Sequence, residues 1–120
     1  MNIPDNRFVV INTLEIMIHV YIHYPTLAEA RKISKFILNK HLAACVNFIK
    51  QEDMYWWQGK MVHTKGIVTL AVTQKKHYTA IETLVKKYHS FKVPCIMELP
   101  IGRAIPAYTQ WLVKETKHSQ

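Results

Sequence analysis

The stretch IMIHVYIHYPTLAEARKISKFILNKH, residues 16–41, decides the fold. Apolar residues alternate with other residues over 16–24, and this period of two predicts a strand that the following proline ends. Thr26 and Glu29 then fit a capping box, in which each side chain satisfies a backbone N–H at a helix start. Apolar residues follow at helical spacing, so the sequence predicts a helix over 27–41 with one face covering a sheet.

The rest of the chain continues this alternation of strands and helices. It predicts further strands over 43–54, 61–73 and 93–101, and further helices over 75–89 and 107–117. The segment Gln58-Gly59-Lys60 offers a turn between the two middle strands. The order strand, helix, strand, strand, helix, strand predicts an α+β protein with a ferredoxin-like, split βαβ antiparallel sheet, followed by a C-terminal helix.

Length and composition allow one folded domain. The chain has 120 residues, of which 49% are hydrophobic and 20% charged, and this excludes both a disordered chain and two full domains. No window reaches the roughly 18 uninterrupted apolar residues that a membrane-spanning helix needs. We divide the chain into an N-terminal extension over 1–15, with a strand-like segment at 8–14, and one domain over 16–120.

The cysteine content and the first residues predict a location. The segment at 1–7 contains both Asp5 and Arg7 and lacks the basic, apolar and small-residue order of a secretion signal. Cys45 and Cys95 are the only cysteines, fewer than a small disulfide-stabilised domain usually carries. We therefore expect a reducing, cytoplasmic setting.

The net charge raises nucleic acid as a partner. Sixteen Lys and Arg residues against eight Asp and Glu residues give a formal charge of +8. The lysines are dispersed, however, and the pair Lys65-Gly66 precedes aliphatic residues where an RNA-recognition strand needs aromatic ones. Nucleic-acid binding is therefore an alternative that the motifs do not favour.

No motif for catalysis is present in the sequence. There is no nucleophile elbow, no glycine-rich phosphate loop and no two-histidine zinc helix. Glu52 and Asp53 are adjacent on a predicted strand, so their side chains point to opposite faces and do not form a carboxylate pair. We expect a protein that is not an enzyme.

Several spaced motifs carry a family resemblance: LAACVN at 42–47, YWWQGK at 55–60, His89 followed by Val93-Pro94, and finally Tyr108 and Trp111. Together they resemble the CutA family of divalent-cation tolerance proteins over about residues 17–116. The resemblance implies a tight homotrimer of ferredoxin-like protomers, with strands extended across subunit boundaries and a likeness to the PII signalling proteins. It also implies a role in tolerance of copper and other divalent ions, with a metal ion or small ligand in a cleft near the segment ACVN at 44–47.

Three residues are candidate metal ligands. Cys45 matches the family motif and is a soft ligand that suits reduced copper, although a small buried hydrophobic role is the alternative. His89 matches the family histidine, and its alternative is stabilisation by a helix dipole. Cys95 adds a soft ligand on the opposite edge of the predicted sheet, so we expect the two thiols to approach only across subunits. The two histidines His19 and His23 lie about 13 Å apart on one strand and cannot chelate one ion.

Aromatic residues near segment ends are candidate contacts for the cleft and the trimer, because a small monomer covers so much apolar surface with difficulty. The alternative is that the tryptophans lie in the core of the monomer. The candidate contacts are the aromatic residues Tyr55, Trp56, Trp57, Tyr108 and Trp111, together with Gly59 and Lys60, which match the hairpin motif of the family.

The chain departs from the family pattern at Gln58, Val72, Ser90 and Cys95. Two of these positions lose an acidic residue, which weakens the case for a hard cation such as magnesium. The leading hypothesis is a cytoplasmic CutA-like trimer that binds copper, a related ion or a small ligand. A nucleic-acid-binding module and an adaptor trimer that recruits another protein are the alternatives.

Overall fold

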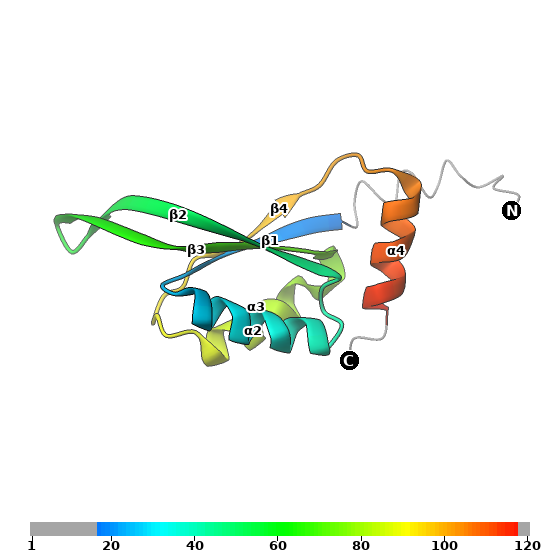
Figure 1. The fold of residues 1–120 in the computed structure, drawn as a ribbon, viewed down its shortest axis with the longest axis horizontal. Helices are drawn as coiled ribbons and strands as arrows, with labels where there is room; N and C mark the ends of the chain where they lie inside the picture. Colours follow the sequence, from blue (N-terminus) through cyan, green and yellow to red (C-terminus); the bar gives the residue numbers. More distant parts are fainter. Residues whose placement is uncertain (1–16, 118–120) are drawn as a thin grey trace, which may run out of the picture.

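The computed structural model describes residues 17–117 (Figure 1). The predicted extension over 1–15, with its strand-like segment, lies outside the described residues. The elements follow the predicted order: β1 (Met17–Tyr24), α2 (Leu27–Asn39), β2 (Cys45–Trp57), β3 (Lys60–Gln74), the single 3-10 turn η1 (Lys75–His77), α3 (Tyr78–Tyr88), β4 (Ile96–Pro100) and α4 (Pro106–Thr116).

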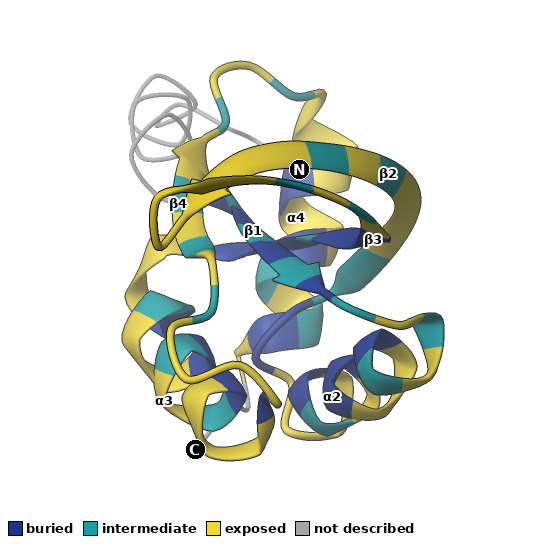
Figure 2. Cartoon of the chain, turned by 90° about the vertical axis from the view of Figure 1, so that its left-hand side faces the viewer, coloured by how far each residue is buried: buried dark blue, intermediate teal, exposed yellow. Residues whose placement is uncertain are grey.

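The four strands form one antiparallel sheet in the order β2-β3-β1-β4. This order confirms the predicted ferredoxin-like α+β fold. Helices α2 and α3 cover one face of the sheet, and alternate β1 side chains are buried beneath them (Figures 1 and 2). This core contains Ile18, Val20, Ile22, Tyr24, Ala30, Ile33, Ile37, Ile81 and Val85.

The start of α2 shows half of the predicted capping box. The hydroxyl of Thr26 accepts the backbone N–H of Glu29 at 3.1 Å, as expected for an N-cap. The carboxylate of Glu29 instead accepts the backbone N–H of Ser90 at 3.0 Å and so ties α2 to the loop after α3. The helix ends at Asn39, before the predicted limit, because His41 takes a left-handed conformation with φ 55°.

The hairpin of β2 and β3 is longer than the rest of the sheet. β1 pairs with β3 only as far as Tyr24 opposite Ile67, so residues 51–66 continue as a two-stranded ribbon (Figure 1). We call residues 51–66 the ribbon. Its turn is confirmed as a two-residue hairpin, with positive φ at both Gln58 and Gly59, which matches the twist of the strands.

The tryptophans do not form a monomer core. Trp56 and Trp57 in the ribbon are 70% and 55% exposed, and Trp111 on α4 is 40% exposed. The alternative that all three are buried within one chain is therefore wrong. Their exposure follows from the length of the ribbon, which carries the first two beyond the layer of α2 and α3.

The C-terminal helix lies at the end of the sheet where β1 begins. Leu112 packs with Met17 and Val72. Strand β4 begins at Ile96 rather than at the predicted residue 93, because the proline at 94 has no N–H to donate to a neighbouring strand. No helix among residues 17–117 is long and apolar enough to cross a membrane.

Candidate functional site

Among residues 17–117, much of the face of the sheet opposite α2 and α3 is uncovered, and we call this the open face. Tyr21 and His23 point to it because they alternate with the buried side chains of β1. Met97 lies opposite Tyr21 on β4 and is 45% exposed, while Ile49 on β2 is 44% exposed. A sheet face with these apolar side chains in solvent is typical of an interaction surface.

A cleft of about 640 Å³ opens on this face at the base of the ribbon. It lies between β1, the ribbon and the loop that connects α3 to β4. Aromatic side chains and a few polar groups line it together, as in many ligand sites. We call it the ribbon cleft, and its lining is Tyr21, His23, Gln51, Asp53, Met54, Tyr55, Trp57, Ser90, Phe91, Lys92, Val93 and Cys95.

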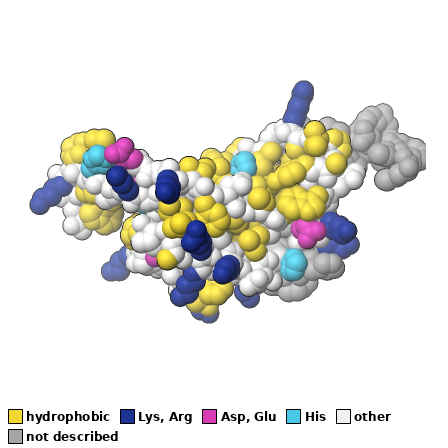
Figure 3. Space-filling model, viewed as in Figure 1, with side chains coloured by type: hydrophobic (Ala, Val, Ile, Leu, Met, Phe, Trp, Pro, Cys, Tyr) yellow, Lys and Arg dark blue, Asp and Glu magenta, His cyan; other side chains and the backbone are white. Residues whose placement is uncertain are grey.

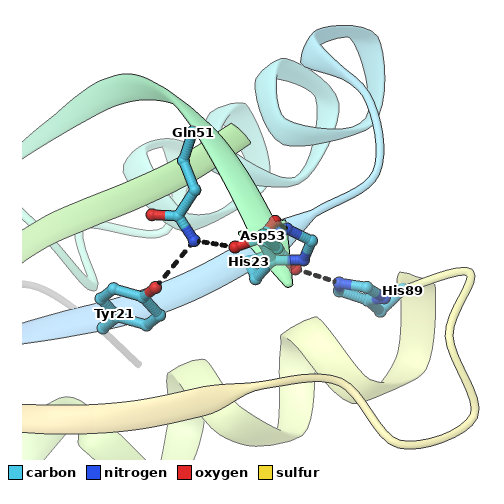
Figure 4. Close-up of polar contacts among 5 residues, drawn as sticks. All are labelled: Tyr21, His23, Gln51, Asp53 and His89. Carbon is cyan, nitrogen blue, oxygen red and sulfur yellow. Dashed lines mark hydrogen bonds and ion pairs between the residues drawn. The ribbon is translucent and has the colours of Figure 1, made fainter. Parts of the chain in front are cut away.

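Four polar side chains form a connected network in the ribbon cleft (Figure 4). Nε2 of His23 lies 2.7 Å from Oδ2 of Asp53, and the two side chains are only 16% and 19% exposed. The amide of Gln51 donates to the other oxygen of Asp53 and to the hydroxyl of Tyr21 at 3.2 Å. The network therefore joins the base of the ribbon to β1.

This network was not predicted from the sequence. The spacing along the chain compares His23 with His19 on one strand and Asp53 with its neighbour Glu52, and it does not relate His23 to Asp53. The two acids do diverge as expected, since Glu52 lies 2.6 Å from the exposed ring of His63 while Asp53 turns toward β1. Alternation in the sequence does predict that Tyr21 and His23 share one face of the sheet. It does not predict that Gln51 and Asp53 meet them, because that depends on the register of β2.

Glycine at position 66 makes room for the network. A Cβ atom there would lie 2.5 Å from Nε2 of His23 and 2.7 Å from the backbone oxygen of Tyr24. Real Cβ contacts are never so short, so a side chain at Gly66 would displace the His23 ring. The strand therefore needs a glycine where the imidazole crosses it.

His89 lies on the face of the sheet that α2 and α3 cover, where it contacts Tyr24, and it does not line the ribbon cleft. Its Nε2–H donates to the backbone oxygen of His23 at 2.7 Å, and its Nδ1 accepts the backbone N–H of Phe91 at 3.0 Å. The ring also stacks on Tyr24 at 5.2 Å, and its side chain has no exposed surface. The metal role of His89 stays a prediction, but both ring nitrogens already have partners within the chain.

We expect a His89→Ala variant to lose stability and to keep whatever affinity for added metal ions the unmodified protein has. Removing the ring leaves a buried carbonyl and a backbone N–H without their partners, which costs about 2–3 kcal/mol in the free energy of unfolding. Chemical denaturation and metal analysis of the refolded protein measure the two effects. The control is His63→Ala, whose exposed pair with Glu52 contributes less than about 1 kcal/mol. Loss of bound metal from a folded His89→Ala protein would contradict this expectation.

The two cysteines lie in different surroundings. Cys45 is half-buried and packs against the cluster of Met17, Val72 and Leu112, with its thiol 3.7 Å from the amide oxygen of Asn47. Cys95 is exposed and lines the ribbon cleft. Burial first, and the nearby Asp53 carboxylate second, raise the pKa of its thiol.

One chain does not bring the predicted ligands together. Cys45 on β2 and Cys95 before β4 are separated by three strand spacings, roughly 14 Å across the sheet. Among residues 17–117, no group of three His, Cys, Asp or Glu side chains is placed to hold a metal ion. Their approach across subunits stays a prediction.

The predicted cleft and trimer contacts fall into two groups. Tyr55 and Trp57 line the ribbon cleft, and the ribbon also carries Trp56, Gly59 and Lys60. The other two contacts, Tyr108 and Trp111, lie on α4 with their rings tilted against each other and their centroids 5.4 Å apart. The two groups lie at opposite ends of the protomer (Figure 1), and Figure 3 shows hydrophobic side chains gathered at the far end of the ribbon.

Comparison with known proteins gives consistent matches. The family model described as CutA1 divalent ion tolerance protein matches residues 18–115. The divalent-cation tolerance protein CutA of Archaeoglobus fulgidus is 34% identical over 93 residues, which cover 78% of this chain and 91% of the relative. The protein of the same name from Thermus thermophilus is 34% identical over 98 residues, with coverages of 81% and 95%.

Solved structures agree with these sequence matches. The structure of the periplasmic divalent cation tolerance protein CutA from Archaeoglobus fulgidus superposes with a TM-score of 0.82 at 32% identity, covering 83% of this chain and 98% of that chain. The crystal structure of CutA1 from Oryza sativa gives a TM-score of 0.82 at 30% identity, with coverages of 87% and 96%.

The comparisons correct the predicted location. The structural relative from Archaeoglobus fulgidus is named a periplasmic protein, so the prediction of a cytoplasmic setting is wrong. That prediction depended on the first residues and on the small number of cysteines. Neither property determines a compartment, because a protein with two unpaired thiols folds by its hydrophobic core in either setting.

Proposed function

Because the chain belongs to the CutA1 divalent ion tolerance protein family, we propose that it acts in divalent metal tolerance as a homotrimer that binds a metal ion or small ligand between its subunits. Copper is the first ion to test, since the exposed thiol of Cys95, which lines the ribbon cleft, is a soft ligand. The proposed activity is binding rather than catalysis.

The ribbon supports self-association. Within the part of the chain that the structure describes, each ribbon strand beyond Ile67 pairs only with the other. An isolated two-stranded ribbon is marginally stable in water. Its large apolar side chains are nevertheless exposed to solvent, which is unfavourable. Contacts with further copies of the chain would bury them. The exposed set is Met54 at 67%, Tyr55 at 41%, Trp56 at 70%, Trp57 at 55% and Met61 at 54%.

The open edges of the sheet support a closed ring of subunits. The outer edges of β2 and β4 have no neighbouring strand among residues 17–117. Unpaired edges are available for pairing with another chain, and a head-to-tail contact between two different edges closes into a ring when the rotation is one third of a turn. A trimer formed in this way would leave no long strand edge in solvent.

The ribbon cleft is the observation that carries the binding proposal. It combines Trp57 and Tyr55 from the ribbon, whose exposed surface is expected to meet a second copy, with the polar network around His23 and Asp53. Cys95 adds a soft donor at the rim. Since the described part of one chain does not supply three ligands, an ion held here would take its remaining ligands from solvent or a neighbouring subunit.

Native mass spectrometry under reducing conditions, before and after copper is added, tests the proposal. The expected result is a species of three chains that gains metal in a simple ratio. A trimer that gains no metal would overturn the metal part and leave small ligands or a protein partner as the occupants of the cleft. A monomer would overturn the intersubunit site altogether.

A further inference from the structure

His23 and Cys95 are opposed across β1 and the start of β4. The backbone N–H of His23 donates to the carbonyl of Cys95 at 3.1 Å, directly beside the paired residues Ile22 and Ile96. Directly opposed residues in antiparallel strands point to the same face of a sheet. Both side chains accordingly line the ribbon cleft.

The contact between His23 and Asp53 prepares the imidazole to bind a metal ion. A carboxylate accepts hydrogen bonds, so the 2.7 Å contact with Oδ2 of Asp53 places the ring proton on Nε2 of His23. In the neutral ring the lone pair is then on Nδ1, which has no hydrogen-bond partner among the described residues. Metal-binding histidines commonly donate their second nitrogen to a carboxylate in this way, which sets the tautomer and the orientation of the ring.

The spacing of the two residues suits one ion. Opposed residues have Cβ atoms about 5 Å apart. Tetrahedral bonds of about 2.0 Å to nitrogen and about 2.3 Å to sulfur place the two donor atoms about 3.5 Å apart. The His23 ring leans over Gly66 toward Asp53, so the Cys95 side chain must turn toward Nδ1 for the two donors to reach this separation. His19 and His23, about 13 Å apart along one strand, cannot reach it.

We propose that Nδ1 of His23 and Sγ of Cys95 form a two-donor site for a borderline or soft transition-metal ion such as Zn²⁺, with Asp53 as a positioning residue behind the histidine. The inference deepens the proposed function, on whose metal-binding activity it rests. A nitrogen and a sulfur donor favour such ions over magnesium or calcium. On binding, the Cys95 thiol releases its proton to solvent and the thiolate bonds to the ion.

Cys45 does not have the same arrangement. Its thiol lies against the amide oxygen of Asn47, and the residue opposite it on β3 is Val72 rather than a histidine. We therefore expect replacement of Cys95, but not of Cys45, to weaken metal binding. Cys45 is the matched control for Cys95, and His19, on the same strand and face as His23, is the matched control for the histidine.

Titration of the full chain with Co²⁺, followed by displacement with Zn²⁺, tests the site. Co²⁺ bound to a thiolate shows a sulfur-to-metal charge-transfer absorption. We expect this band in the unmodified protein and in Cys45→Ser and His19→Gln. We expect it to disappear in Cys95→Ser, and we expect affinity to fall by at least 10-fold in His23→Gln and by about 10- to 100-fold in Asp53→Asn.

Failure of the His23 and Cys95 site and failure of metal binding by the whole protein give different results in this titration. A band that persists in Cys95→Ser and disappears in Cys45→Ser would overturn the His23 and Cys95 site and leave metal binding in place. A trimer that binds no Co²⁺, Zn²⁺ or copper would overturn the metal part of the proposed function as well. Circular dichroism of each variant verifies that lost binding does not reflect lost folding.

Discussion

Replacing Trp56 and Trp57 together by alanine is expected to convert the proposed trimer into monomers. Aromatic side chains that are buried in an interface commonly contribute about 2–4 kcal/mol each to binding. The two residues are the most exposed tryptophans of the chain. Because all interfaces of a closed trimer are equivalent, the substitution weakens each of them. Sedimentation or light scattering at micromolar concentration measures the change in mass.

The single variants show which face of the ribbon is in the interface. Adjacent residues on a strand point to opposite faces, so Trp56→Ala and Trp57→Ala remove contacts on different sides. The control is Tyr88→Ala, which removes an aromatic side chain of 42% exposure from α3, outside the ribbon. Persistence of the trimer in the double variant would show that the ribbon does not hold the subunits together.

Gly66→Ala is expected to destabilise the fold and to break the contact between His23 and Asp53. The added methyl group would meet Nε2 of His23 at 2.5 Å and the backbone oxygen of Tyr24 at 2.7 Å. The imidazole can rotate away, but the backbone oxygen moves only if β1 moves with it. Such overpacking costs about 1–3 kcal/mol in the free energy of unfolding, and we also expect weaker binding of Zn²⁺.

Gly102→Ala is the matched control, because no atom lies within 4 Å of a Cβ built there. We expect its free energy of unfolding to stay within about 0.5 kcal/mol of the unmodified protein. Urea unfolding at one fixed protein concentration compares the two variants, since association makes apparent stability depend on concentration. Equal stability of Gly66→Ala and Gly102→Ala would show that the crossing of His23 over β3 is not tightly packed.

Local patterns predicted most of the fold. Alternation over 16–24 placed β1, the Thr26 hydroxyl marked the start of α2, and the Gln58-Gly59 pair marked the hairpin turn. Each of these depends on residues that are neighbours in the chain, so a period or a short motif contains the necessary information. The spaced motifs indicated the family, and residues 18–115 match the model of that family.

The sites depended on contacts between distant residues. His23 and Asp53 are 30 positions apart in the chain, and His89 donates to the carbonyl of a residue 66 positions away. Which side chains meet over such distances depends on strand register, on the point where β1 stops pairing and on a glycine that leaves room for a ring.

The sequence by itself determined the order of the elements, the turn, the helix start and the family. Only the tertiary structure decided that His89 is buried with both nitrogens occupied, that Cys45 and Cys95 face different surroundings, and that His23 joins Asp53 in a cleft. The physical reason is that periodicity reports which face of a strand a residue occupies, whereas the partner on that face is set by the packing of strands that are distant in sequence.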